Sequence, residues 1–179
     1  DWVSIGIFTA CIVFPVSILL DGSLTKIERD RIFVIYIIAF FVIFFWAAYE
    51  QAGASLTLFA AEQTDRTILG WEMPASWIQS FNPFFVVILA AIMPSVWGAL
   101  NKRGMEPASP TKQAIGLLLL SLGYLVICFG VKDVQPGVKV SLIWLTGLYF
   151  IHTMGEIALS PIGLSMVNKL TPVRFASLM

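Results

Sequence analysis

The 179-residue sequence carries about half the charge of a soluble domain. Asp, Glu, Lys and Arg make up 12% of it, against about 25% in soluble proteins, while 58% is hydrophobic and the mean hydropathy is +0.86. With this composition and 14 phenylalanines the chain is neither disordered nor nucleic-acid-binding. It is predicted to be an all-α, polytopic transmembrane helical bundle lying in the lipid bilayer.

Five apolar segments approach or exceed the roughly 20 residues that cross a bilayer. In chain order they cover residues 2–20, 31–61, 81–100, 114–131 and 140–168, and a sixth begins near Val173. The first is barely long enough and contains Pro15. We therefore set residues 1–22 apart as a linker with a lateral or transmembrane helix, and assign residues 23–179 to one bundle. Both ends suggest a fragment of a larger protein.

Two of these segments are longer than a bilayer requires. Segments 31–61 and 140–168, at 1.5 Å per residue, would each form a helix longer than about 40 Å. Such helices must tilt, kink or project from the membrane. Pro161 lacks a backbone donor and predicts a bend one turn beyond Glu156 in the last segment.

The basic residues predict an orientation. Eight of the eleven lie on alternate connections: Lys26, Arg29, Arg31, Lys102, Arg103, Lys112, Lys169 and Arg174. The opposite connections hold only Arg66, Lys132 and Lys139. Because cytoplasmic loops are enriched in Lys and Arg, the side with eight is predicted to be cytoplasmic.

Two acidic residues lie near the middle of apolar segments, where an ionisable group is costly and marks a candidate functional site. The first is Glu50, which shares a helix face with Trp46 at i,i+4 spacing and is followed by small residues at 52–55. One interpretation is a cavity-facing carboxylate beside an aromatic wall. The alternative is a structural carboxylate that pairs with a cation elsewhere in the protein.

The second is Glu156, on one face with His152 and Ser160. A carboxylate in a low-dielectric cavity can exchange a proton for a cationic ligand. The alternative is a protonated glutamic acid that is hydrogen-bonded to the neighbouring helical turn. His152, the only histidine, could join a proton relay, but a hydrogen bond to a neighbouring helix is the more common role for such a residue.

Asn82 precedes Pro83 at the start of the third apolar segment, where it could simply be a helix N-cap. The sequence lacks metal-ligand spacing, phosphate loops, catalytic triads and nucleotide-binding fingerprints. We therefore expect that the chain has no metal site and is not an enzyme.

Three motifs and their order resemble the proton-dependent oligopeptide transporter family of the major facilitator superfamily. They are Phe45-Trp46 through Glu50-Gln51-Ala52-Gly53, Phe81-Asn82-Pro83-Phe84-Phe85, and Gly155-Glu156 through Ser160-Pro161 to Lys169-Leu170, with Pro172–Ser177 as a weaker match. The resemblance covers residues 24–179 and implies helices seven to ten and the start of eleven, an incomplete carboxy-terminal bundle. Segment 2–20 would resemble the extra hairpin helix of bacterial members.

The resemblance implies roles for individual residues. Glu156 matches the glutamate that receives the peptide amino terminus, and Asn82 the asparagine that hydrogen-bonds the peptide backbone. Trp46 matches a cavity aromatic and Ser160 a pocket hydroxyl. Glu50 matches the acid tied to gating and proton coupling through a basic partner in the other half.

The implied function is proton-coupled symport of di- and tripeptides across a bacterial cytoplasmic membrane, driven by the proton gradient with no cofactor. The amino-terminal bundle is a required partner, so the fragment alone should not transport. Tyr49 stands where some members carry a second acid, and with His152 it is a possible minor site residue. Alternatives are another facilitator-type carrier, for sugars, drugs or nitrate, and a non-transporting membrane assembly module.

Overall fold

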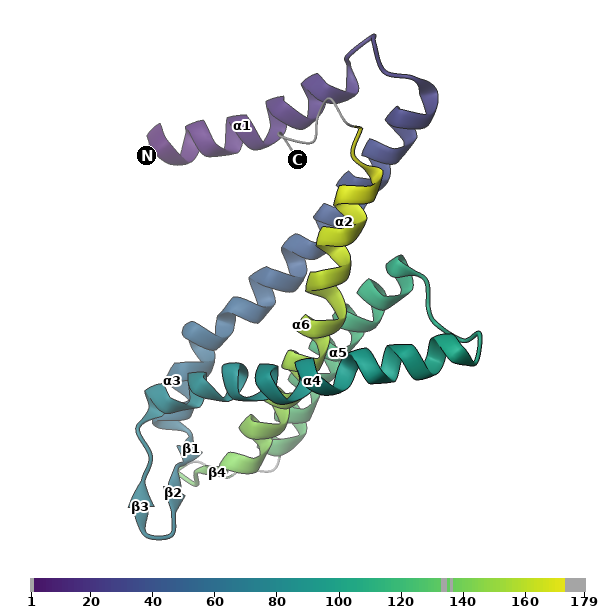
Figure 1. Cartoon of the computed structure of the whole chain (residues 1–179). Helices are drawn as coiled ribbons and strands as arrows, with labels where there is room; N and C mark the ends of the chain where they lie inside the picture. Colours follow the sequence, from purple (N-terminus) through teal and green to yellow (C-terminus); the bar gives the residue numbers. More distant parts are fainter. Residues whose placement is uncertain (1, 133–134, 136, 173–179) are drawn as a thin grey trace. The chain divides into compact units, whose positions relative to one another are not determined.

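The computed structural model describes residues 2–132, 135 and 137–172 (Figure 1). Within them five stretches are long and apolar enough to cross a membrane: Trp2–Leu19, Lys26–Glu62, Ala75–Lys102, Ser109–Val131 and Leu142–Leu170. Each coincides with one predicted apolar segment, so the chain is an all-α polytopic membrane bundle. The expected sixth span and the match at residues 173–177, with Arg174, lie outside the described residues.

The chain forms two compact units, with boundaries inside the second and the last long helices. Unit 1 contains residues up to Ile43 together with those from Leu164 onward, and unit 2 contains Phe44–Gly163. In unit 1, helix α1 (Trp2–Leu19) is joined by a short turn to α2 (Lys26–Tyr49).

The start of α2 is stabilised by a reciprocal cap. The backbone N–H of Thr25 donates to Glu28 Oε2 at 2.9 Å, and the backbone N–H of Glu28 donates to Thr25 Oγ1 at 3.3 Å. This capping box satisfies donors that the first helical turn leaves free. Ile18, Leu24 and Ile32 pack together beside it as the small core of unit 1.

The second apolar segment is not one continuous α-helix. The α-helix α2 ends at Tyr49 and is followed by the 3₁₀ turn η1 (Glu50–Gly53) and the short helix α3 (Ser55–Glu62). Between them Ala54 adopts φ −120° and ψ −96°, outside the helical region. The excess length of this segment is therefore accommodated by a break at Glu50.

Side chains from neighbouring helices satisfy backbone carbonyls at the break. Tyr124 Oη donates to the carbonyl of Ala48 at 2.6 Å, and Tyr149 Oη donates to that of Ala52 at 3.4 Å. Thr57 Oγ1 also donates to Ala52, at 2.7 Å. Irregular backbone at membrane depth is tolerated where protein groups replace the missing helical bonds, as they do here.

The connection after α3 contains short strands that the sequence pattern did not predict. The strands β2 (Thr67–Ile68) and β3 (Trp71–Glu72) form an antiparallel hairpin, and β1 (Thr64–Asp65) pairs in parallel with β4 (Val140–Ser141) before the last helix. Leu69 and Gly70 form the two-residue turn with φ of 50° and 83°, as a type I′ hairpin requires. The 3₁₀ segment η2 (Ala75–Ser80) then leads into the next span.

Three long helices complete unit 2: α4 (Phe81–Lys102), α5 (Ser109–Val131) and α6 (Leu142–Leu170), which continues through Pro161 into unit 1. In the first turn of α5, Lys112 Nζ contacts Glu106 Oε1 of the preceding loop at 2.5 Å and lies 4.7 Å from the centre of the Trp97 ring of α4. That hydrogen bond lowers the pKa of Glu106 below its ordinary value.

Close packing of α5 against α6 depends on three glycines of α5 spaced seven residues apart. A Cβ at Gly116 would lie 2.9 Å from the carbonyl of Gly155, and one at Gly130 2.5 Å from the Trp144 ring. A Cβ at Gly123 would lie 2.3 Å from Cδ2 of His152. Small residues that let two backbones approach are the usual basis of helix association in membranes.

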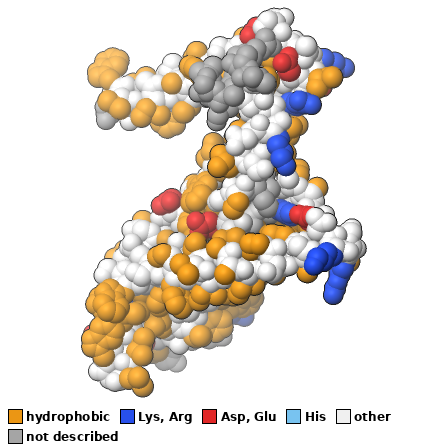
Figure 2. Space-filling model, viewed as in Figure 1, with side chains coloured by type: hydrophobic (Ala, Val, Ile, Leu, Met, Phe, Trp, Pro, Cys, Tyr) orange, Lys and Arg blue, Asp and Glu red, His pale blue; other side chains and the backbone are white. Residues whose placement is uncertain are grey.

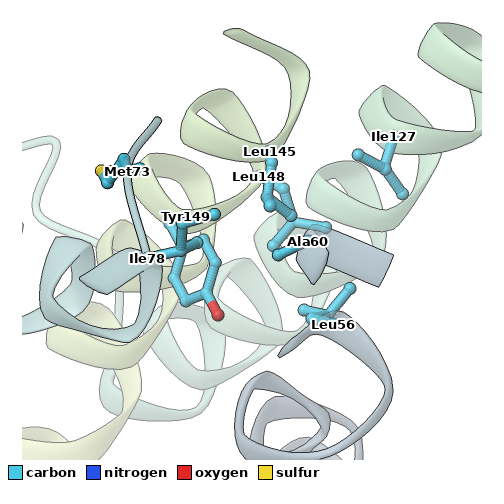
Figure 3. Packing of buried hydrophobic residues seen from close by; sticks show 8 residues of the cluster. All are labelled: Leu56, Ala60, Met73, Ile78, Ile127, Leu145, Leu148 and Tyr149. Carbon is cyan, nitrogen blue, oxygen red and sulfur yellow. The ribbon is translucent and has the colours of Figure 1, made fainter. Parts of the chain in front are cut away.

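The core of unit 2 lies between α3, the 63–80 connection, α5 and α6 (Figure 3). It is formed by Leu56, Ala60, Met73, Ile78, Ile127, Leu145, Leu148 and Tyr149. Many large apolar side chains remain exposed instead of joining this core. Figure 2 shows them over the visible face of unit 2, with Lys and Arg side chains gathered where α4 joins α5. Such a surface suits contact with lipid or with further membrane helices.

Candidate functional site

Polar side chains from α2, α4 and α6 meet in one hydrogen-bonded cluster. Tyr49 Oη donates to Glu156 Oε2 at 2.5 Å, and Asn82 Nδ2 donates to the same oxygen at 2.9 Å. Asn82 Nδ2 also donates to Tyr49 Oη. All three side chains are half-buried. The structure therefore brings together three candidate residues: Glu156, Asn82 and Tyr49, the last of which was predicted only as a possible minor site residue.

A buried threonine determines the direction of these hydrogen bonds. Thr153 Oγ1 donates to the carbonyl of Tyr149 at 2.7 Å, so it can only accept from Asn82 Nδ2, 3.2 Å away. With three acceptors around it, the Asn82 amide must present its NH₂ group to the cluster. Its carbonyl oxygen is consequently directed away from the Glu156 carboxylate.

Glu156 has no ion-pair partner among the residues that the structure describes. Its carboxylate is held by two neutral donors among three apolar helices, where an uncompensated charge is costly. A ligand that brings a positive charge would supply the missing counter-charge. A half-buried carboxylate with neutral donors is thus suited to bind an ammonium group or a proton.

Aromatic rings enclose Tyr49. Phe45 stacks on it with ring centres 5.5 Å apart, and Trp46 meets it edge-on at 5.4 Å. Trp46 is half-buried and contacts the cluster through Tyr49. Phe45 and Trp46 therefore form an aromatic wall against Tyr49, whose hydroxyl donates to Glu156.

His152 is 2% exposed, and its Nε2 lies 3.0 Å from the backbone carbonyl of Leu120 on α5. Its ring also packs 4.8 Å from that of Tyr124. These contacts favour the helix-packing interpretation, because donation to Leu120 commits Nε2 to the backbone. The proton-relay role stays a prediction.

Two predicted site residues do not join the cluster. Glu50 begins η1 as an exposed side chain, with neither a hydrogen bond nor an ion pair to any described residue. The Ser160 hydroxyl is buried and has no hydrogen-bond partner in the described part of the chain. Both remain candidates by position.

The sequence pattern undervalued three members of this region. The N-cap of α4 is Ser80, so the cap interpretation of Asn82 is wrong, and its side chain points into the cluster instead. Tyr49 was predicted only as a possible minor site residue, and Thr153 was not predicted. The available signal was the i,i+3 spacing of Thr153 and Glu156, which places a hydroxyl on the same helix face. In the described residues, no three His, Cys, Asp or Glu side chains gather as a metal site.

Comparison with known proteins shows the family to which the chain belongs. The model of the POT family matches residues 7–179. A peptide transporter of Yersinia enterocolitica, YePEPT, is 38% identical over 155 residues, which cover 86% of this chain and 30% of that protein. Dipeptide and tripeptide permease A of Escherichia coli K12 is 33% identical over 146 residues, 82% of this chain and 29% of the permease.

The fold comparison agrees. The crystal structure of a peptide transporter POT in complex with sulfate superposes with a TM-score of 0.86 at 36% identity, covering 97% of this chain and 34% of that one. The chain thus spans about a third of the length of the relatives it matches. Since the match runs over nearly all of these 179 residues, in sequence and in fold, the chain belongs to the POT family of membrane transporters.

Proposed function

We propose that this chain, within a full-length transporter, contributes to proton-coupled symport of di- and tripeptides across a bacterial cytoplasmic membrane. The observation that carries the proposal is the Glu156 carboxylate, which lies inside a span, is held by neutral donors and has no cation partner among the described residues. An uncharged or anionic substrate would give no reason to keep it there. The relatives named as peptide transporter and di- and tripeptide permease support the same substrate class.

In this proposal Glu156 receives the amino terminus of the peptide. Asn82 offers its carbonyl oxygen to the peptide backbone, because its NH₂ group is engaged with the cluster. Trp46 is proposed to form an aromatic wall of the binding site, because its ring lies edge-on to that of Tyr49. Ser160 would contact the peptide after a change of side-chain rotamer that exposes its buried hydroxyl.

Glu50 is proposed as the proton-coupling and gating residue. It is exposed at the helix break and is available to a basic residue of the amino-terminal bundle. The loops rich in Lys and Arg are proposed to face the cytoplasm. Inward movement of one positive charge through a potential of 100 mV supplies about 2.3 kcal/mol, which is the proposed source of accumulation.

The test is uptake of labelled dialanine into proteoliposomes that contain the full-length protein, with and without an inward proton gradient. We expect gradient-dependent uptake that other dipeptides compete away and free alanine does not. Glu156→Gln should abolish binding of dialanine but weaken binding of N-acetylated dialanine much less, because only the free amine uses the carboxylate. The exposed Glu62→Gln is the matched control and should behave as wild type.

Uptake that does not depend on the proton gradient would contradict the proposal. So would an equal loss of binding of dialanine and N-acetylated dialanine in Glu156→Gln. Absence of peptide uptake would favour another facilitator-type carrier. For Glu50→Gln we expect impaired proton-driven accumulation with near-normal counterflow, because exchange of peptide for peptide needs no net proton movement. The reverse pattern would make Glu50 a binding residue.

A further inference from the structure

The two oxygens of the Glu156 carboxylate are not equivalent in this structure. Both donors, Tyr49 Oη and Asn82 Nδ2, converge on Oε2, at 2.5 and 2.9 Å. No described residue donates a hydrogen bond to Oε1. Two donors satisfy the lone pairs of one carboxylate oxygen, so Oε2 has no capacity left for a ligand.

Tyr49 cannot readily release Oε2, because its own position is held from several sides. Its ring stacks on Phe45 with an interplanar angle of 19° and lies edge-on to Trp46. It also packs 6.1 Å from the ring of His152. A tyrosine whose ring is enclosed in this way presents its hydroxyl in one place, so the carboxylate is oriented by a rigid donor.

The Asn82 amide fixes the same arrangement from a second helix. The hydrogen of Tyr49 Oη is committed to Glu156, and the hydrogen of Thr153 Oγ1 is committed to the carbonyl of Tyr149. Both oxygens therefore act as acceptors towards Asn82 Nδ2, whose two hydrogens are shared among them and Glu156 Oε2. Reversing the amide would place its carbonyl oxygen against the carboxylate, so the network has one consistent orientation.

We propose that Tyr49 is a positioning residue that confines ligands to the Oε1 atom of Glu156 and thereby makes the site selective for a primary ammonium over a guanidinium group. An ammonium group is a compact charge that one oxygen can bind. A guanidinium group binds a carboxylate best through two parallel hydrogen bonds, one to each oxygen. Because Oε2 already accepts two hydrogen bonds, this pair of parallel bonds to a guanidinium group cannot form. The inference rests on the proposed role of Glu156 as the receptor of the ligand amine.

The experiment compares binding of alanyl-alanine and of its Nα-amidino derivative, in which the amine is replaced by guanidine, to the purified full-length protein. Dissociation constants are measured by calorimetry without a proton gradient. The wild type should bind the amine at least about tenfold more tightly, a difference of about 1.4 kcal/mol. In Tyr49→Phe the preference for the amine, taken as the dissociation constant of the guanidine divided by that of the amine, should fall at least about fivefold. The reason is that Oε2 becomes available for the second hydrogen bond of the guanidinium group.

Asn82→Leu, which removes the other donor to Oε2, is the second variant and should move the ratio in the same direction. Tyr36→Phe, which removes a hydroxyl 3.4 Å from the Pro15 carbonyl in unit 1, is the control and should leave the ratio unchanged. A wild type that prefers the guanidine, or an unchanged ratio in folded Tyr49→Phe, overturns the inference. If the wild type binds neither compound, it is the proposed function that fails.

Discussion

The contact between α5 and α6 at Gly123 gives a prediction of stability that can be worked out from distances. A methyl group added at Gly123 would lie 2.3 Å from His152 Cδ2 and 2.6 Å from Nε2. Ordinary contact begins near 3.4 Å, so the ring must retreat by about 1.1 Å. The ring is buried and its Nε2 is hydrogen-bonded to Leu120, so it cannot retreat without breaking that bond or separating the helices.

Gly123→Ala is therefore expected to destabilise the protein. Overpacking of this kind costs about 1–3 kcal/mol, and loss of the hydrogen bond from His152 adds about 0.5–1.5 kcal/mol. Gly98→Ala in α4 is the matched control, because a Cβ there meets nothing within 4 Å in this chain. Alanine favours a helix over glycine by about 0.5–1 kcal/mol, so the control should be neutral or stabilising.

The assay is the apparent melting temperature of detergent-solubilised protein, followed by fluorescence-detected gel filtration. A double-mutant cycle with His152→Ala isolates the clash, because removing the ring leaves room for the new methyl group. In that background Gly123→Ala should cost less than in the wild type, with a coupling of about 1–3 kcal/mol. If Gly123→Ala melts like Gly98→Ala, or costs the same with and without the histidine ring, the packing argument is refuted.

Two further predictions concern hydrogen bonds outside the cluster. The bond from Lys112 lowers the pKa of Glu106, so its stabilising effect is present above the ordinary glutamate value of about 4.3 and is lost as the pH falls through the lowered value. Glu106→Gln should therefore melt earlier than wild type at neutral pH, and the gap should close in acid; a gap independent of pH would contradict this. Tyr124→Phe, which removes the donor to Ala48, should cost about 1–3 kcal/mol, whereas Tyr36→Phe, with its 3.4 Å contact, should cost less. Equal melting temperatures for these two variants would show that the freed carbonyl does not need Tyr124.

Hydropathy alone predicts the spans of this chain, because each apolar segment must satisfy its backbone within itself and therefore becomes helix. It does not predict the break at Glu50. The i,i+4 argument that placed Trp46 and Glu50 on one face assumed a continuous α-helix. The α-helix ends at Tyr49, and a 3₁₀ turn rotates successive residues by about 120° instead of about 100°. Tyr49, the last residue of the α-helix, is the residue of this segment that donates to Glu156.

The hairpin and the short strands around residues 64–72 were missed for a different reason. Each strand has only two residues, too few for an alternating pattern to emerge from the sequence. The turn also places Leu69 at a positive φ, where glycine or asparagine would be the expected signal. Pairing of β1 with β4 joins residues far apart in the chain, and local patterns carry no information on such contacts.

The sequence predicts that Glu156 lies inside a span, but it does not predict which groups stabilise a carboxylate there. Insertion of an ionisable group at the centre of a span costs about 2.5–3.5 kcal/mol. A hydrogen bond to a charged group contributes about 1.5–3 kcal/mol, so the two donors on Oε2 offset that cost without any cation. They come from residues 107 and 74 positions away, which is why spacing could not identify them. Since both act on the same oxygen, they stabilise the carboxylate and leave Oε1 free for the ligand that we propose.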